Sequence, residues 1–191
     1  MLDGLQPTRG EPLPFADTIH IRAFTLANGL VVYAAPGVEG SARAQYLNHW
    51  HEATFGEGFA DAPLLIHEAD APFVDVPVTT FSAADSLDDF QLIPIPGHTP
   101  GSTAYLWDNG EHRVLFTADT IMLRGGEWRA AVLASSDRAT YLASLALLRD
   151  LDFDVLVPWV AAGAFHAVTD RADARRRIGA IIDRVSRGAS G

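Results

Sequence analysis

The sequence predicts a single layered α/β domain in which many short strands precede two helices. Short alternating or apolar runs recur from residue 19 to residue 118, whereas helical spacing of apolar residues appears only after residue 135. The chain has 191 residues, which suits one domain with a real core, and no linker or low-complexity tract divides it. We expect residues 1–18, with three prolines and two glycines, to be an irregular lead-in and 19–191 to be the domain.

Two Asn-Gly pairs predict β-hairpins in the first two thirds of the chain. Asn28-Gly29 and Asn109-Gly110 each separate two strand-like runs. Both residues of such a pair tolerate positive φ, which a tight hairpin turn requires. The runs predicted as strands are 19–26, 30–35, 43–48, 63–67, 73–96 (two strands around a polar turn), 103–108, 112–118 and 154–158.

Two helices are expected near the end of the chain, over residues 136–150 and 170–187. The first carries leucines near one face, with Ser135 or Ser136 as its N-cap, and the second carries isoleucines opposite an arginine-rich face. Each apolar stripe needs a sheet face to cover it. We therefore expect both helices to pack on the same sheet.

The charge balance excludes several classes of partner. Asp and Glu outnumber Arg by 24 to 14, no lysine occurs, and the formal net charge is −10. Nucleic acids and anionic membrane surfaces are met by basic faces, so we expect neither as a partner. No apolar run reaches the roughly 18–20 residues that span a bilayer, and no secretory signal pattern opens the sequence. We expect a small-molecule substrate or ligand and a cytoplasmic location, with the oligomeric state left open.

Three short segments carry the residues best suited to chemistry in this cysteine-free chain. His49 and His51 lie two positions apart at a strand end, where both imidazoles can reach one ion. His98 stands in the segment Pro-Gly-His-Thr-Pro-Gly-Ser, a stiff loop between strands. Asp119 follows an apolar strand. Taken singly, each has an ordinary interpretation: solvated histidines, a histidine bonded to the backbone, and an Asx turn.

The order of these segments resembles the metallo-β-lactamase superfamily, over about residues 19–187, as a degenerate member of its glyoxalase-type hydrolase branch. The resemblance implies an αβ/βα four-layer sandwich of two mixed β-sheets with outer helices. It also implies a metal site at one edge, between the sheets. Members are mostly zinc hydrolases, including lactamases, thioesterases, lactonases and nucleases. By this resemblance His49, His51, His98 and Asp119 are metal ligands.

Departures from the family pattern fall on one half of the implied site. The pattern His-x-His-x-Asp-His reads here as His49 to Thr54, with Ala53 and Thr54 at its last two positions. The late histidine is replaced by Val160. The resemblance therefore implies that the first metal site is kept and that only Asp119 remains of the second. We expect one bound zinc ion. We expect apolar side chains, Trp159 or Val160 with Ala53, to close the vacated space, and we give Glu52 and His166 little weight as replacement ligands.

Three hypotheses about function follow. The first is a single-metal hydrolase that cleaves a small ester, thioester or lactone with a zinc-bound water, with Asp119 as the catalytic group that orients the water and takes its proton. The second is a catalytically inactive descendant that serves as a ligand-binding or structural protein. The third is a metal-free protein in which the histidines are relics. The loss of half of a two-metal clamp argues against phosphodiester cleavage.

Overall fold

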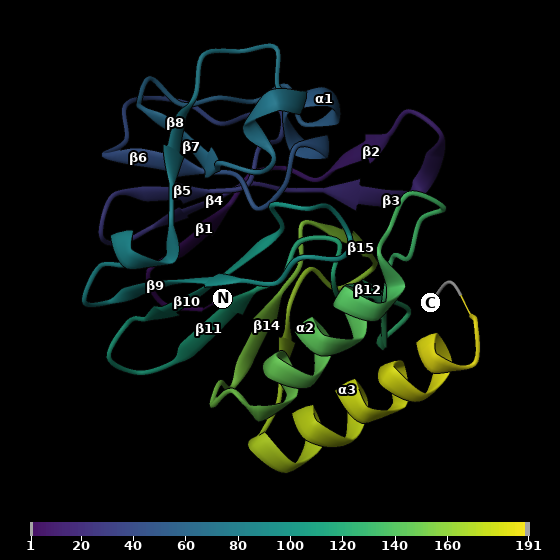
Figure 1. Cartoon of the computed structure of the whole chain (residues 1–191). Coiled ribbons are helices and arrows are strands. Elements are labelled where there is room, and N and C mark those ends of the chain that lie inside the picture. Colours follow the sequence, from purple (N-terminus) through teal and green to yellow (C-terminus); the bar gives the residue numbers. More distant parts are fainter. Residues whose placement is uncertain (1, 190–191) are drawn as a thin grey trace.

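Three β-sheets form the framework of the computed structural model, which describes residues 2–189 (Figure 1). The first sheet has the strand order β1 (Leu5–Pro7), β4 (Phe24–Leu26), β5 (Leu30–Val32), β6 (Ala44–Tyr46), β7 (Leu64–His67) and β8 (Thr79–Phe81). The second has the order β16 (Ala167–Val168), β14 (Val155–Val157), β11 (Arg113–Phe116), β10 (Thr103–Asp108) and β9 (Phe90–Pro94). The third has the order β13 (Glu127–Arg129), β12 (Met122–Arg124), β15 (Val160–Ala162), β3 (Ala16–Ile21) and β2 (Glu11–Leu13).

Each sheet mixes parallel and antiparallel pairs. The strands β5 to β8 run parallel to one another, while β4 and β5 form an antiparallel hairpin across Asn28-Gly29. The strands β10 and β11 form the second predicted hairpin, across Asn109-Gly110, and β11 pairs with β14 in parallel. Both hairpin predictions are confirmed.

Alternation along the second sheet divides the interior into two apolar layers. Tyr105 and Phe116 belong to the layer shared with the first sheet, where Tyr33 and Phe24 also lie. Their chain neighbours point the other way because successive side chains of a strand face opposite sides. Those neighbours meet the helices on the outer face, in a layer that includes Leu106, Leu115, Leu156, Leu145, Leu148, Ile178 and Ile181.

The helices α2 (Arg138–Asp150) and α3 (Arg171–Ser186) lie side by side on this outer face (Figure 1). Their predicted packing on one sheet is confirmed. The predicted N-cap of α2 is wrong: the cap is Asp137, whose Oδ1 accepts the Thr140 N–H at 3.1 Å. Asp170 caps α3 in the same way, through the Asp173 N–H at 2.8 Å. No helix in residues 2–189 combines the length and apolarity needed to cross a bilayer.

The outer face of the first sheet has a thinner cover. Its apolar patch, Ala34, Leu47 and Ile66, packs against the short helix α1 (His51–Phe55), the 3₁₀ turn Ala71–Phe73 and nearby loops. A second 3₁₀ turn covers Ala83–Asp85. The predicted sandwich of mixed sheets with outer helices is confirmed as a fold class.

The predicted pair of sheets appears as three because two neighbouring strands of the second sheet are interrupted. The chain leaves β11 after Phe116 and resumes as β12, and it leaves β14 at Pro158 and resumes as β15. The continuations β12 and β15 pair in parallel, as β11 and β14 do. Proline has no N–H for a sheet ladder, and Ala118 has a φ of 43° that no strand residue adopts. The break places Asp119 in the turn between β11 and β12.

The expectation of an irregular segment over residues 1–18 is wrong. This segment contains β1, β2 and the start of β3. Its prolines do not prevent pairing because β1 and β2 are edge strands of their sheets, where a residue without an N–H is tolerated. The boundary of the single domain stays a prediction.

A surface ion pair next to β11 gives a pH-dependent stability prediction. The Nδ1 of His112 lies 2.8 Å from Asp154 Oδ2, and this hydrogen bond raises the His112 pKa. Since the folded chain holds the proton more tightly, the pair stabilises fully below the unfolded pKa of about 6.5. The contribution disappears as the pH rises through the folded pKa. Urea unfolding of wild type and His112→Gln should differ at pH 5.5, by less than about 1 kcal/mol for so exposed a pair, and should coincide at pH 9. An equal difference at both pH values would contradict this.

Candidate metal centre

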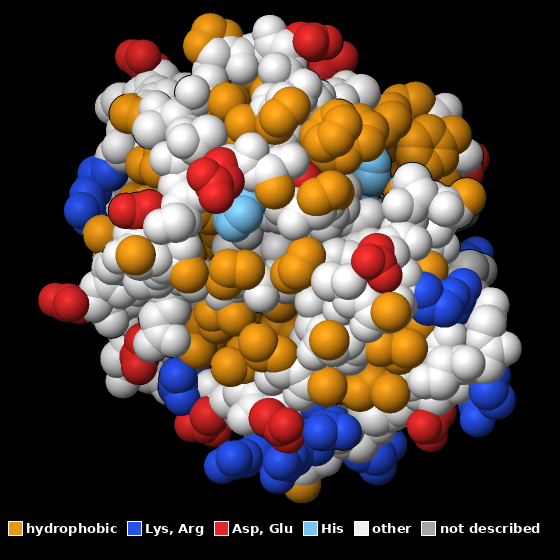
Figure 2. All heavy atoms as spheres, in the orientation of Figure 1, with side chains coloured by type: hydrophobic (Ala, Val, Ile, Leu, Met, Phe, Trp, Pro, Cys, Tyr) orange, Lys and Arg blue, Asp and Glu red, His pale blue; other side chains and the backbone are white. Residues whose placement is uncertain are grey.

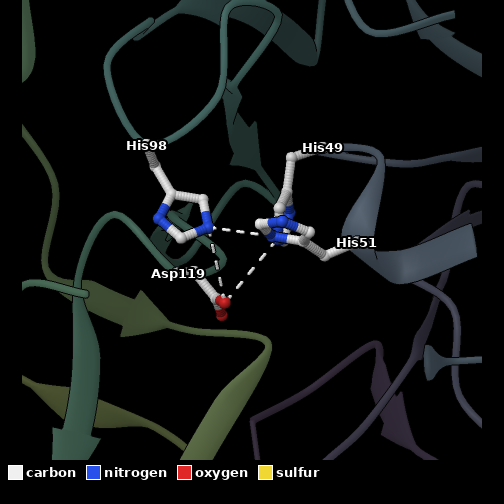
Figure 3. A group of neighbouring side chains, drawn as sticks. All are labelled: His49, His51, His98 and Asp119. Carbon is white, nitrogen blue, oxygen red and sulfur yellow. Dashed lines mark hydrogen bonds and ion pairs between the residues drawn. The ribbon is translucent and has the colours of Figure 1, made fainter. Parts of the chain in front are cut away.

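Four side chains from three separate segments converge at the sheet break (Figure 3). His49 and His51 come from the junction of β6 with α1, His98 from the loop between β9 and β10, and Asp119 from the turn between β11 and β12. One ligand atom from each residue lies within 4.8 Å of the others. The structure thus brings together all four residues that the sequence predicted as metal ligands.

The outer nitrogen of His49 is held by a buried carboxylate. Its Nδ1 donates to Glu52 Oε1 at 3.0 Å, and both side chains are fully buried. Nε2 points toward the cluster, 3.6 Å from Asp119 Oδ2, and presents a lone pair there once the imidazole is neutral with its proton on Nδ1. This Nε2 is buried without a hydrogen-bond partner in the described chain.

His98 is oriented in the same way by a backbone group. Its Nδ1 donates to the carbonyl oxygen of Ala131 at 2.7 Å, so Nε2 also carries a lone pair. This Nε2 lies 3.6 Å from Asp119 Oδ2 and 3.1 Å from His51 Nδ1. Inward-facing imidazole lone pairs next to a carboxylate suit a divalent cation of the zinc type. The donor set therefore fits a metal ion.

The carboxylates and imidazoles perturb one another's proton affinity. Burial alone lowers the His49 pKa, but the carboxylates of Asp119 and Glu52 outweigh it and raise that pKa to about 10. Burial and the charges of His49 and His98 lower the His51 pKa to about 3. Burial, followed by the charge of His49, also lowers the His98 pKa. His51 and His98 therefore stay neutral at pH 7, which is the form that binds metals, whereas His49 is protonated there and has to release its Nε2 proton when it binds a metal.

The backbone around Asp119 is held by two tyrosines. The Tyr33 hydroxyl donates to the Val157 carbonyl and accepts the Ala118 N–H, each at 2.8 Å. It thereby bridges the two interrupted strands. On the other side, the Tyr141 hydroxyl donates to the carbonyls of Thr120 at 2.8 Å and Asp119 at 3.3 Å. The Asp119 carboxylate is thus carried by a fixed turn.

Asp70 is a functional residue that the sequence did not single out. Its buried carboxylate accepts the Gly101 N–H at 2.7 Å, the Thr99 hydroxyl at 2.6 Å and the Trp50 N–H at 3.1 Å. It therefore ties the loop of His98 to the segment of His49 and His51. The sequence offers no signal for this role, because Asp70 stands in an ordinary polar stretch after β7.

Glu52 also matters more than its sequence position indicated. It was weighed only as a replacement ligand, whereas Oε1 accepts from both His49 Nδ1 and the Asn48 N–H, each at 3.0 Å. A carboxylate behind a ligating histidine fixes its tautomer and raises its basicity. His166, the other residue considered as a replacement, lies outside the cluster of four.

We expected the space beside the cluster to be closed by apolar side chains. The space is lined by apolar side chains, but it is open. Trp159 and Val160 line a cavity of about 410 Å³ together with His51 and Asp119. Trp159 donates its indole N–H to the Ala34 carbonyl at 2.7 Å and lies edge-on to His49. Ala53 does not line the cavity and instead packs on the outer patch of the first sheet.

Replacing the buried carboxylate by an amide should weaken metal binding. In Glu52→Gln the volume and one acceptor oxygen remain, but the negative charge that strengthens His49 as a ligand is lost. We expect zinc affinity, measured by competition with a chromogenic chelator, to fall about 10–100-fold. The matched control is Glu57→Gln, an exposed residue after α1, which should bind like wild type. Equal affinity in Glu52→Gln and wild type would show that Glu52 only fills space.

The mixed sheets, outer helices and His/Asp cluster together define a protein with a metal-binding site at a sheet edge. The profile of the Metallo-beta-lactamase superfamily matches residues 32–158, two thirds of the sequence, and the chain belongs to that superfamily. A comparison with curated protein sequences finds no match.

Solved structures of low sequence identity share the fold. The metallo-beta-lactamase family protein TTHA1429 from Thermus thermophilus aligns with a TM-score of 0.66 and 16% identity, over 97% of this chain and 80% of that one. The superfamily protein ST1585 from Sulfolobus tokodaii gives 0.63 and 14%, over 93% and 85%. AidC, described as a dizinc quorum-quenching lactonase, gives 0.54 and 12%, over 80% and 76%.

Proposed function

We propose that this chain is a hydrolase that binds one zinc ion and cleaves a small ester, thioester or lactone. The observation that supports this most is the convergence of His49, His51, His98 and Asp119, two of which, His51 and Asp119, line a cavity. Zinc in catalytic sites is commonly held by three protein ligands with a further position open. The fold is also that of AidC, for which lactonase chemistry is described.

In this proposal the three histidines hold the metal and Asp119 is the catalytic residue. When bound, the metal supplies a Lewis acid that polarises a carbonyl group and lowers the pKa of water. The Asp119 side chain keeps 15% exposure, and its Oδ1 has no hydrogen-bond partner within residues 2–189. The carboxylate as a whole reaches the cavity wall, where it would orient a water molecule and accept its proton. Glu52 and Asp70 position the histidines without touching the substrate.

The number of ions is part of the same proposal. Of the three positions at which the family pattern has further ligands, Val160 lines the cavity, Thr54 is exposed and Ala53 packs elsewhere. None carries a side chain that replaces a histidine or carboxylate. The same observation favours the second candidate function, a catalytically inactive descendant that keeps the metal and binds a ligand.

Metal counting and an ester panel test the proposal. Wild type, purified without added chelator, should contain about one zinc per chain, whereas His98→Ala should contain almost none and lose more than about 100-fold in kcat/KM on aryl esters and thioesters. His166→Ala is the control because it removes a histidine outside the cluster.

The outcomes separate the candidates. One metal without hydrolysis of any ester, thioester or lactone would favour the inactive descendant. No metal in wild type, even after dialysis against zinc, would contradict both the hydrolase and the metal-binding inactive descendant. Two ions per chain would contradict the single-site part of the proposal.

A further inference from the structure

The cavity beside the cluster has an almost wholly apolar wall. Apart from His51 and Asp119, its lining consists of Ala131 and large apolar side chains: Leu13, Phe15, Ile19, Trp50, Phe55, Met122, Leu133, Trp159 and Val160. None of these residues is an arginine, and the sequence has no lysine. The Asp119 carboxylate is therefore the wall's only formal charge when His51 is neutral.

Exposed apolar side chains gather at the mouth of this cavity. Five large apolar residues of the described chain are exposed: Phe15, Phe73, Leu133, Leu147 and Val168. Phe15 and Leu133 line the cavity, and the Phe73 ring lies 5.9 Å from that of Trp50. Figure 2 shows large orange side chains beside the pale-blue histidine at the upper right, over the region of α1 and the β2–β3 hairpin in Figure 1. Such clustering marks a binding surface better than scattered single residues do.

The hairpin of β2 and β3 supplies one side of the mouth. Phe15 stands at its tip, is 70% exposed, and meets Phe55 of α1 edge-on with ring centroids 5.5 Å apart. Leu13 and Ile19 extend the same wall inward. The volume of about 410 Å³ lies in the lower part of the range of small-molecule sites, about 300–1,000 Å³.

We infer that this cavity binds the uncharged, apolar acyl chain of the substrate, and that Phe15 and Leu133 determine the preference for chain length. The inference rests on the proposed function for its reacting carbonyl, and it adds the substrate class. An apolar chain is stabilised when it leaves water and packs against this wall. An anionic arm would lose its hydration against this apolar wall, where no arginine is present to pair with it.

A chain-length series on the metal-loaded protein tests the substrate class. For p-nitrophenyl acetate, butyrate and hexanoate, we expect kcat/KM to rise by up to about fourfold per methylene, the ratio that corresponds to burying one CH₂. The mono-p-nitrophenyl ester of glutaric acid, similar in length but anionic, should be at least tenfold poorer than the butyrate. A flat profile, or a glutarate ester as good as the butyrate, would overturn the inference.

Matched variants test which residues determine the dependence of kcat/KM on chain length. Phe15→Ala and Leu133→Ala should flatten the chain-length dependence, lowering kcat/KM more for the hexanoate than for the acetate. Leu147→Ala is the control, because Leu147 lies on α2 and is as exposed as Leu133, at 43% against 42%. An equal loss of chain-length preference in Leu147→Ala would overturn the assignment to this cavity.

Binding without reaction separates this inference from the proposed function. The binding of butan-1-ol, hexan-1-ol and octan-1-ol can be followed by quenching of tryptophan fluorescence. Their affinity should increase with chain length and should be lower in Phe15→Ala. If the alcohols bind so and no ester is cleaved, the acyl-chain site stands and the hydrolase proposal fails. If esters are cleaved and the alcohols do not bind, the hydrolase proposal stands and the acyl-chain site is refuted.

Discussion

Asp70→Asn is expected to lower the free energy of unfolding by about 3 kcal/mol and to weaken zinc binding together with it. The carboxylate accepts three hydrogen bonds in a fully buried position. An amide offers one acceptor oxygen, so in either orientation its NH₂ group faces a backbone N–H, of Gly101 or of Trp50. A buried donor left without an acceptor costs about 1–3 kcal/mol, and loss of the charged acceptor adds to this.

Thermal and urea unfolding check the stability change, and chelator competition checks the metal. A loss of about 3 kcal/mol corresponds to a fall in Tm of roughly 6–12 °C for a chain of this size. Metal affinity should fall as well, because the loop of His98 is no longer tied to the segment of His49. Asp75→Asn is the control: Asp75 is an exposed carboxylate just after the 3₁₀ turn Ala71–Phe73, and the variant's free energy of unfolding should stay within about 0.5 kcal/mol of wild type. Metal affinity unchanged in Asp70→Asn would show that the two loops are held by other contacts.

Gly97→Ala is expected to be the most destabilising of the single substitutions, by about 4 kcal/mol or more. Gly97 has a φ of 134°, which L-residues rarely adopt, and an added Cβ would lie 2.5 Å from both the N and the Cα of Tyr141. These are backbone atoms of α2, so relief requires the helix or the His98 loop to move. We therefore expect lost stability and lost metal binding in the same variant.

Gly110→Ala separates the steric clash of an added Cβ from the backbone strain of a positive φ. Gly110 also has a positive φ, 87°, but an added Cβ there meets nothing within 4 Å. It should cost only the left-handed backbone strain, about 1–2 kcal/mol. Urea unfolding of both variants makes the comparison, and similar losses in the two would refute the steric argument at Gly97.

Features that depend on local chemistry could be predicted from the sequence. Asn28-Gly29 and Asn109-Gly110 carry their turn geometry in their own backbone preferences, and both hairpins formed. The helices followed from the spacing of leucine and isoleucine. The four members of the cluster were found because their order along the chain resembles a family pattern, not because any one of them is distinctive.

Features that depend on long-range placement could not be predicted. The prolines of β1 and β2 indicated irregular structure, and only the position of these strands at sheet edges makes them tolerable. Asp70 acts because two segments distant in sequence, the loop of His98 and the segment of His49 and His51, approach it from both sides. The N-cap of α2 differed by one or two residues, since serine and aspartate both cap helices well.

The interruption of the second sheet separates two tasks within the protein. Most of the residues that hold and orient the histidines belong to loops at the ends of the first two sheets. The exception is Ala131, which follows β13 of the third sheet and accepts the His98 Nδ1–H through its backbone carbonyl. Much of the cavity wall, by contrast, comes from the third sheet: Leu13, Ile19, Met122 and Val160. Side-chain changes at these four positions can therefore reshape what the cavity admits without disturbing a hydrogen bond that orients a histidine. Selectivity and metal retention can diverge independently in such an architecture, and libraries that vary the third sheet alone are the natural way to redirect it.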